Sequence, residues 1–143
     1  MVAIDMRPNN KRILVVEDEH SVARVLTLVL RNAGFEVEHV SSGGAAILSL
    51  DTGSHTAVLL DLGLPDRRGG DVVKRLAAPA PIGARKLVWI VLSAMDISDA
   101  ESMYSVPRER FVNKPFDPWE IVSRLERELE AAIRVEDSNE NHS

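Results

Sequence analysis

The chain has 143 residues, of which 45% are hydrophobic and 27% charged, a composition typical of one soluble globular domain. It contains no cysteine, which excludes disulfide bonds and thiolate metal sites and favours a reducing compartment. The net charge of −5 argues against a surface that binds nucleic acid. Asp5 and Arg7 stand where a signal peptide needs an apolar core, and no later apolar run is long enough to span a membrane, so we expect a cytoplasmic protein.

Apolar runs bounded by turn residues predict five strands, at residues 12–16, 35–40, 57–60, 87–92 and 111–113. Segments with apolar residues at helical spacing lie between or after them, from residue 21 to Gly34, from 42 to 50, from about 70 to Pro79, and from 117 to 134. Residues 96–107 have little apolar content and predict only a short or irregular helix. Asp117 is the expected N-cap of the last helix, with Pro118 at its first position.

Strands that alternate with helices predict a doubly wound α/β fold with a parallel sheet and right-handed crossovers. We expect the flavodoxin-like strand order 2-1-3-4-5 in a single domain that covers residues 12–135. Residues 1–11 show no periodicity and are expected to form a flexible leader. Residues 136–143 are polar and acidic and are expected to form a disordered tail.

Polar residues follow four of the predicted strands, at the point where each strand ends. The first strand is followed by Glu17 and Asp18, the third by Asp61, and the fifth by Lys114, while the fourth ends at Ser93. Because the carboxyl ends of parallel strands share one edge of the sheet, where ligands bind in such folds, we expect these side chains to lie close together.

Three carboxylates held close together repel one another unless a cation lies among them. A hard divalent ion fits this set, and Mg²⁺ fits best, because it takes one or two carboxylates together with a phosphate oxygen and several waters. Lys114 and Ser93 offer an ammonium group and a hydroxyl to phosphoryl oxygens. Asp61, at the centre, is the natural nucleophile for an aspartyl phosphate.

Five separated motifs in this order resemble the receiver domain of two-component response regulators, the chemotaxis-regulator type, across residues 12–134. The motifs are Leu14–Glu19, Leu59–Asp61 with Leu64, Pro65 and Gly69, Val91–Ala94, Phe111, and Lys114–Phe116. The resemblance implies that Asp61 accepts a phosphoryl group from a histidine kinase or a phosphotransfer protein. It also implies that Mg²⁺ is bound by Asp18, Asp61 and the backbone carbonyl of Gly63, with Glu17 acting through water.

The resemblance further implies a switch. Lys114 would contact the phosphoryl group, Ser93 would move towards it, and Phe111 would turn inward, while the peptide bond between Lys114 and Pro115 is expected to be cis. The surface of helix 4, strand 5 and helix 5 would then bind a downstream protein, or a second copy of the chain after phosphorylation. Such a domain acts through protein contacts, without direct nucleic-acid or membrane binding, and catalyses at most its own phosphorylation and dephosphorylation.

Three alternatives share parts of this pattern. A pseudo-receiver, which is an interaction module without phosphorylation, usually lacks the acceptor Asp, the acid pair or the Lys, and all of them are present here. A phosphatase of the haloacid-dehalogenase type would need a second Asp where Gly63 stands. A flavin-binding domain would need a phosphate-binding loop in place of residues 17–19.

Two positions bear on the lifetime of an aspartyl phosphate. In receiver domains the side chains two residues beyond the acceptor Asp and two beyond the switch Ser flank the phosphoryl group. Here these positions hold Gly63 and Met95, and neither side chain can orient an attacking water by a hydrogen bond. We therefore expect slow self-dephosphorylation.

Overall fold

The computed structural model describes residues 11–80, 82 and 86–140, with residues 134–140 described by their backbone. The predicted leader lies outside this range except for Lys11. Within the described residues, parallel strands form one sheet in the order β2-β1-β3-β4-β5, which confirms the predicted order. The strands are β1 (Arg12–Val16), β2 (Glu36–Val40), β3 (Ala57–Leu60), β4 (Val88–Ser93) and β5 (Phe111–Asn113).

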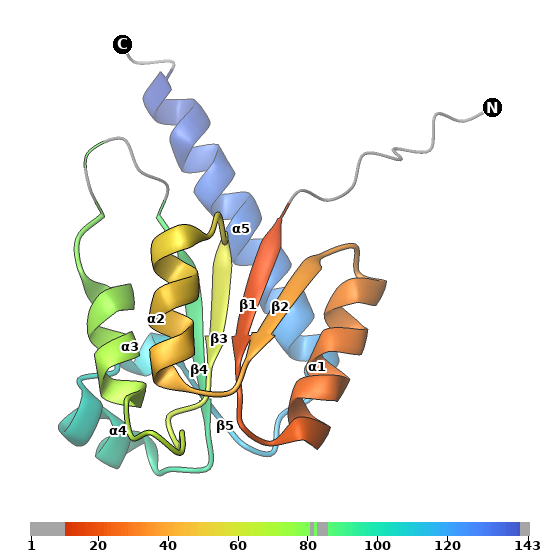
Figure 1. Ribbon diagram of the computed structural model, residues 1–143. Coiled ribbons are helices and arrows are strands. Elements are labelled where there is room, and N and C mark those ends of the chain that lie inside the picture. Colours follow the sequence, from red (N-terminus) through yellow and green to blue (C-terminus); the bar gives the residue numbers. More distant parts are fainter. Residues whose placement is uncertain (1–10, 81, 83–85, 141–143) are drawn as a thin grey trace.

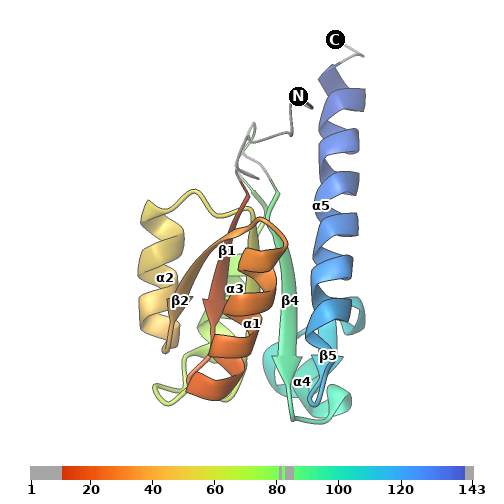
Figure 2. The ribbon, with the colours of Figure 1, turned by 90° about the vertical axis from the view of Figure 1, so that its right-hand side faces the viewer.

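Helices cover both faces of this sheet. One face carries α1 (His20–Asn32) and α5 (Pro118–Glu140), and the other carries α2 (Gly43–Thr52), α3 (Gly69–Ala77) and α4 (Ile97–Tyr104) (Figures 1 and 2). A single 3₁₀ turn, η1 (Arg108–Arg110), precedes β5. The doubly wound, flavodoxin-like fold is therefore confirmed.

The hydrophobic core has two layers, one on each side of the sheet. Strand residues alternate between them, so that Leu14, Val58 and Leu60 pack towards α2 and α3 while Ile13 and Leu59 pack towards α1 and α5. All of these side chains are at most 1% exposed. Continuous apolar strands are stable here because helices exclude water from both faces.

Local signals in the sequence set several helix ends. Gly34 follows α1 with a φ of 94°, a conformation that glycine adopts without steric cost. The Ser42 hydroxyl accepts the N–H of Ala45 at 3.2 Å and caps α2. A carboxylate oxygen of Asp117 accepts the N–H of Trp119 at 2.9 Å, which confirms the predicted cap of α5. The Trp119 residue itself is 56% exposed, whereas Trp89 on β4 is only 7% exposed.

The end of α5 differs from the prediction. The helix continues to Glu140, although the sequence pattern placed its end at Arg134 and a disordered tail from Glu136. No glycine or proline lies between residues 119 and 140, and adding a residue to an existing helix costs little compared with nucleation. Residues 141–143 lie outside the described residues.

The segment between β4 and β5 holds the short helix that was predicted there. The helix α4 ends at Tyr104, and the next residue, Ser105, has a φ of 57° and turns the chain out of the helical path. The next residue, Val106, is 1% exposed and packs in the core layer that also holds Phe111. A buried anchor after the helix thus compensates for the low apolar content of α4 itself.

Candidate functional site

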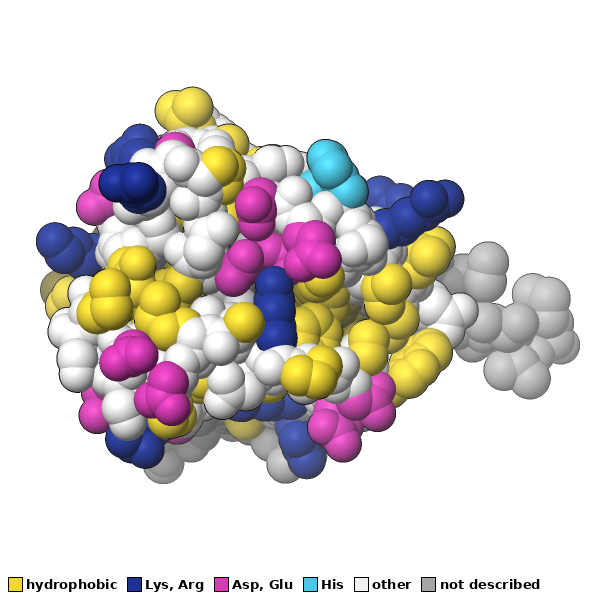
Figure 3. All heavy atoms as spheres, turned by 90° about the horizontal axis from the view of Figure 1, so that it is seen from below, with side chains coloured by type: hydrophobic (Ala, Val, Ile, Leu, Met, Phe, Trp, Pro, Cys, Tyr) yellow, Lys and Arg dark blue, Asp and Glu magenta, His cyan; other side chains and the backbone are white. Residues whose placement is uncertain are grey.

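The carboxyl ends of the strands lie at one edge of the sheet, at the bottom of Figure 1. Strands β1 and β3 are neighbours, with Val16 opposite Leu60, so the residues that follow them are adjacent. The N–H of Asp61 donates to the carbonyl of Val16 at 2.9 Å and carries this pairing one residue further. Viewed from below, Figure 3 shows acidic side chains gathered next to a basic one near the middle of this edge.

Glu17, Asp18 and Asp61 form the acidic cluster. Each contributes a carboxylate oxygen, and these oxygens all lie within 4.8 Å of one another. Glu17 is 2% exposed and Asp61 is 9% exposed, whereas Asp18 faces solvent. The N–H of Gly63 donates to a carboxylate oxygen of Asp61 at 3.3 Å, so the turn after β3 folds back over this carboxylate.

Lys114 brings one positive charge to the acidic cluster. Its Nζ lies 2.6 Å from Oε1 of Glu17 and 3.6 Å from Oδ2 of Asp61. The backbone N–H of Lys114 donates to the carbonyl of Ser93 at 2.9 Å, which continues the pairing of β4 with β5. The peptide bond between Lys114 and Pro115 is cis, as the resemblance implied. One ammonium group is thus paired with two of the three carboxylates in the acidic cluster.

The electrostatics of this arrangement favour a further cation. Burial, together with the nearby Asp61, raises the pKa of Glu17 to about 7, although Lys114 acts in the opposite direction. Burial would lower the pKa of Lys114, but the hydrogen bond to Glu17 and the charges of Asp61 and Glu17 raise it. The buried Oε2 of Glu17 has no hydrogen-bond partner among the described residues. A hard divalent cation with oxygen ligands, such as Mg²⁺, fits this donor set.

Ser93 ends β4 at the predicted edge, whereas Phe111 begins β5, two residues before that edge. Ser93 is 4% exposed, and its hydroxyl accepts the N–H of Met95 at 3.1 Å. Phe111 is 7% exposed and packs inward, in the core layer under α4. The structure therefore brings Ser93 to the same edge as Lys114, while the side chain of Ser93 is engaged in its own turn.

Two further residues that the sequence analysis did not single out support the site. The ring Nε2 of His39 lies 2.7 Å from the carbonyl oxygen of Glu17, which can only accept a hydrogen bond. The side-chain amide of Asn113 donates to the carbonyl of Met95 at 3.0 Å. His39 stands at the end of the strand beside β1, and Asn113 directly precedes Lys114, so their positions were the available signal.

The turn after Asp61 leaves space above its carboxylate. A Cβ atom at Gly63 would lie 3.9 Å from the nearest oxygen of Asp61, which is an ordinary van der Waals distance. The side-chain position next to the acidic cluster is therefore open to solvent.

Comparisons with known proteins agree with this geometry. A family model described as "Response regulator receiver domain" matches residues 13–126. The chain is 35% identical over 115 residues to the sensory transduction protein RegX3 of Mycobacterium tuberculosis, an alignment that covers 79% of this chain and 48% of that protein. It is 34% identical over 119 residues to the DNA-binding response regulator MtrA of Mycolicibacterium smegmatis, covering 83% of this chain and 50% of that protein.

Solved structures show the same fold. The signal receiver domain of a putative Luxo repressor protein from Vibrio parahaemolyticus is 24% identical with a TM-score of 0.74, covering 92% of this chain and 98% of that one. A putative response regulator from Chloroflexus aurantiacus is 30% identical with a TM-score of 0.68, covering 85% of this chain and 99% of that one. The chain spans about half the length of the curated relatives it matches. No helix in the described part of the chain is both long and apolar enough to cross a membrane.

Proposed function

The chain belongs to the response regulator receiver domains of two-component systems, and we propose from this premise that Asp61 is its phosphoacceptor. The single observation that carries the proposal is the acidic cluster, with Lys114 paired to Glu17 and Asp61. Receiver domains accept phosphoryl groups and interact with histidine kinases. The donor for this chain is therefore a kinase phosphohistidine or that of a phosphotransfer protein.

In the proposed reaction, a carboxylate oxygen of Asp61 attacks the phosphorus atom of the donor. The bond from phosphorus to the donor's imidazole nitrogen breaks, and the imidazole keeps the electron pair. Asp18, Asp61 and the carbonyl of Gly63 would hold Mg²⁺, with Glu17 acting through a water. When bound, the ion would supply positive charge to the phosphoryl oxygens.

Lys114 and Ser93 then move towards the phosphoryl group. The phosphoryl group adds about 1.5 to 2 negative charges and strong acceptor oxygens, so the ammonium group of Lys114 is attracted away from Glu17. Ser93 gives up its hydrogen bond with Met95 and donates its hydroxyl to a phosphoryl oxygen. This rearrangement changes the surface of α4, β5 and α5, where a downstream protein binds and where a second phosphorylated copy of the chain can pair.

The deciding experiment measures the intact mass of the protein after incubation with Mg²⁺ and a small phosphodonor. Wild type is expected to gain one phosphoryl group, and the Asp61→Asn variant is expected to gain none. The same incubation with a chelator serves as the control for the metal. If the folded wild type gains nothing, the proposal is wrong and the chain is a pseudo-receiver that binds its partner without phosphorylation.

A further inference from the structure

Asp66 connects the loop after β3 to the start of α2, two segments that are far apart in the sequence. It lies on the loop between β3 and α3, and its carboxylate accepts the N–H of Gly43 at 3.1 Å and that of Gly44 at 2.9 Å. The same carboxylate accepts the N–H of Arg68 at 3.2 Å within its own loop. The hydrogen bond from Gly44, together with those from Gly43 and Arg68, lowers the pKa of Asp66 although partial burial opposes this, so the carboxylate is ionised at neutral pH.

These bonds complete the N-terminal end of α2. The first four N–H groups of a helix have no partner inside the helix. The Ser42 hydroxyl accepts the N–H of Ala45, and the carboxylate of Asp66 accepts those of Gly43 and Gly44 from the loop after β3. Of the three N–H groups that side chains cap at the start of α2, the loop after β3 therefore accepts two, although Asp66 lies 23 residues beyond Gly43.

The two segments also touch closely. A Cβ atom at Gly43 would lie 2.6 Å from the Cβ of Arg68 and 2.8 Å from its carbonyl oxygen. Only a glycine permits this approach, and Gly43 is buried by it. The contact between α2 and the loop is thus part of the packed structure.

Asp66 is also linked to the acidic cluster through a short, anchored stretch of chain. Leu62 and Leu64 are 2% and 5% exposed and lie in the core, and Gly69 at the start of α3 packs against the backbone of Leu62. Gly63, between the two leucines, is exposed, and its N–H contacts the Asp61 carboxylate. The N–H of Leu64 donates to the carbonyl of Leu62 at 2.9 Å, and the N–H of Arg67 donates to the carbonyl of Leu64 at 3.0 Å. The turn that carries Gly63 is therefore hydrogen-bonded to the loop that Asp66 fixes.

We propose that Asp66 is a positioning residue for the metal site, because it fixes the loop to α2 and thereby keeps the Gly63 carbonyl in place as a ligand. The inference rests on the proposed function for the identity of that ligand. Residues that orient the ligands of a metal typically change its affinity by about 10- to 100-fold when they are mutated.

The test compares Asp66→Ala with Ser42→Ala, each of which removes capping bonds from the same end of α2. The dissociation constant for Mg²⁺ is measured by isothermal titration calorimetry without phosphodonor, and thermal unfolding is recorded for each variant. We expect Asp66→Ala to weaken Mg²⁺ binding roughly tenfold. Ser42→Ala is expected to stay within about twofold of wild type, although it also destabilises the protein. Asp66→Asn, which keeps one acceptor oxygen, is expected to fall between wild type and Asp66→Ala.

Equal affinities in wild type and Asp66→Ala would overturn the inference. Equal weakening by Asp66→Ala and Ser42→Ala would also overturn it, because the effect would then come from loss of helix stability. A wild type that does not bind Mg²⁺ contradicts both this inference and the proposed function. A wild type that binds Mg²⁺ but gains no phosphoryl group contradicts the proposed function alone, and the affinities of the variants still decide the role of Asp66.

Discussion

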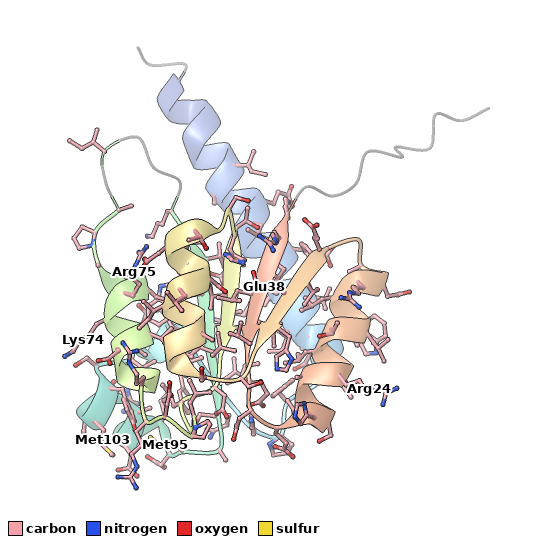
Figure 4. All side chains as sticks on the ribbon, viewed as in Figure 1. Arg24, Glu38, Lys74, Arg75, Met95 and Met103 are labelled. Carbon is pink, nitrogen blue, oxygen red and sulfur yellow. The ribbon has the colours of Figure 1, made fainter. Side chains whose placement is uncertain are left out.

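Two glutamates, Glu38 on β2 and Glu17 directly after the neighbouring strand β1, occupy opposite kinds of environment. Glu38, labelled in Figure 4, projects from β2 towards α2, where its carboxylate accepts the Ser49 hydroxyl at 2.6 Å and lies 2.8 Å from His55 and 3.2 Å from Arg12. The Ser49 hydrogen bond lowers the pKa of Glu38, and His55 and Arg12 act in the same direction against the effect of burial. Glu17 has one cationic partner, a buried oxygen without a partner, and a pKa raised to about 7.

The difference separates a structural cluster from a binding site. The carboxylate of Glu38 is satisfied by three groups of the protein itself, so it ties β2 to α2 and to the start of β3. The acidic cluster holds more negative charge than the protein neutralises, which costs stability and creates a place for a cation. Glu38 is therefore a structural carboxylate, whereas the acidic cluster can bind a cation.

The largest expected effect comes from Glu38→Gln, which should lower the free energy of unfolding by about 2 kcal/mol, because hydrogen bonds to a charged acceptor are lost. Chemical denaturation at neutral pH measures it. The Mg²⁺ affinity should not change, since Glu38 and its partners lie away from the carboxyl edge of the sheet. A variant as stable as wild type would contradict the structural role of Glu38.

A glycine beside the Glu38 cluster provides the next test. A Cβ atom at Gly53 would lie 2.3 Å from the ring of His55, which is buried against it. We expect Gly53→Ala to lower the free energy of unfolding by about 1.5 kcal/mol, because the added methyl group displaces the imidazole. Denaturant midpoints measure the change.

Mg²⁺ binding at the acidic cluster should stabilise the folded state. A ligand at ten times its dissociation constant stabilises the folded state by about 1.4 kcal/mol. Mg²⁺ at that concentration should therefore raise the unfolding free energy of wild type by this amount, and a chelator should reverse it. Asp61→Asn should lose most of the effect. The same stabilisation in Asp61→Asn would place the cation elsewhere.

The open space above Asp61 leads to a kinetic prediction. Gly63→Asn adds an amide that can orient a water towards the phosphoryl group, in a position where a Cβ meets only ordinary contacts. We expect the lifetime of the aspartyl phosphate to fall by about tenfold, which corresponds to about 1.4 kcal/mol in activation free energy. Decay of the phosphorylated mass over time measures it. Equal lifetimes would show that Gly63 does not set the rate.

The smallest effect concerns pH. The pKa of Glu38 is lower in the folded state than its ordinary value of 4.5, so its contribution is complete above that value and is lost as the pH falls through the folded pKa. Stability below about pH 4.5 should therefore fall more steeply in wild type than in Glu38→Gln. Denaturation series at several pH values compare the slopes. Parallel slopes would mean that Glu38 keeps an ordinary pKa.

Much of the fold and of the candidate site was predictable because the signals are local. Apolar runs that end in Glu17, Asp61, Ser93 and Lys114 define both the strands and the edge where these residues meet. The topology follows from the alternation of strands and helices, and Asp117 marked the start of α5 by its own chemistry.

The rest depends on contacts across the fold. The preference of Lys114 for Glu17 over Asp61 is set by the positions of two loops, and no spacing in the sequence encodes it. The burial of His55 against Glu38 joins the loop before β3 to β2, and a scattered histidine gives no sign of it. Asp66 stands in a charged stretch of the sequence with Arg67 and Arg68, and its hydrogen bonds to Gly43 and Gly44 depend on α2 lying beside that loop.

The two tryptophans give the chain a built-in optical reporter. Trp89 lies in the core on β4, and Trp119 stands exposed in the first turn of α5, five residues after Lys114. Fluorescence from the exposed indole is accessible to a soluble quencher such as iodide, whereas that of the buried indole is shielded until the protein unfolds. Changes near the turn that carries Lys114 and global unfolding can therefore be followed in one unlabelled sample, as two separable components of the emission.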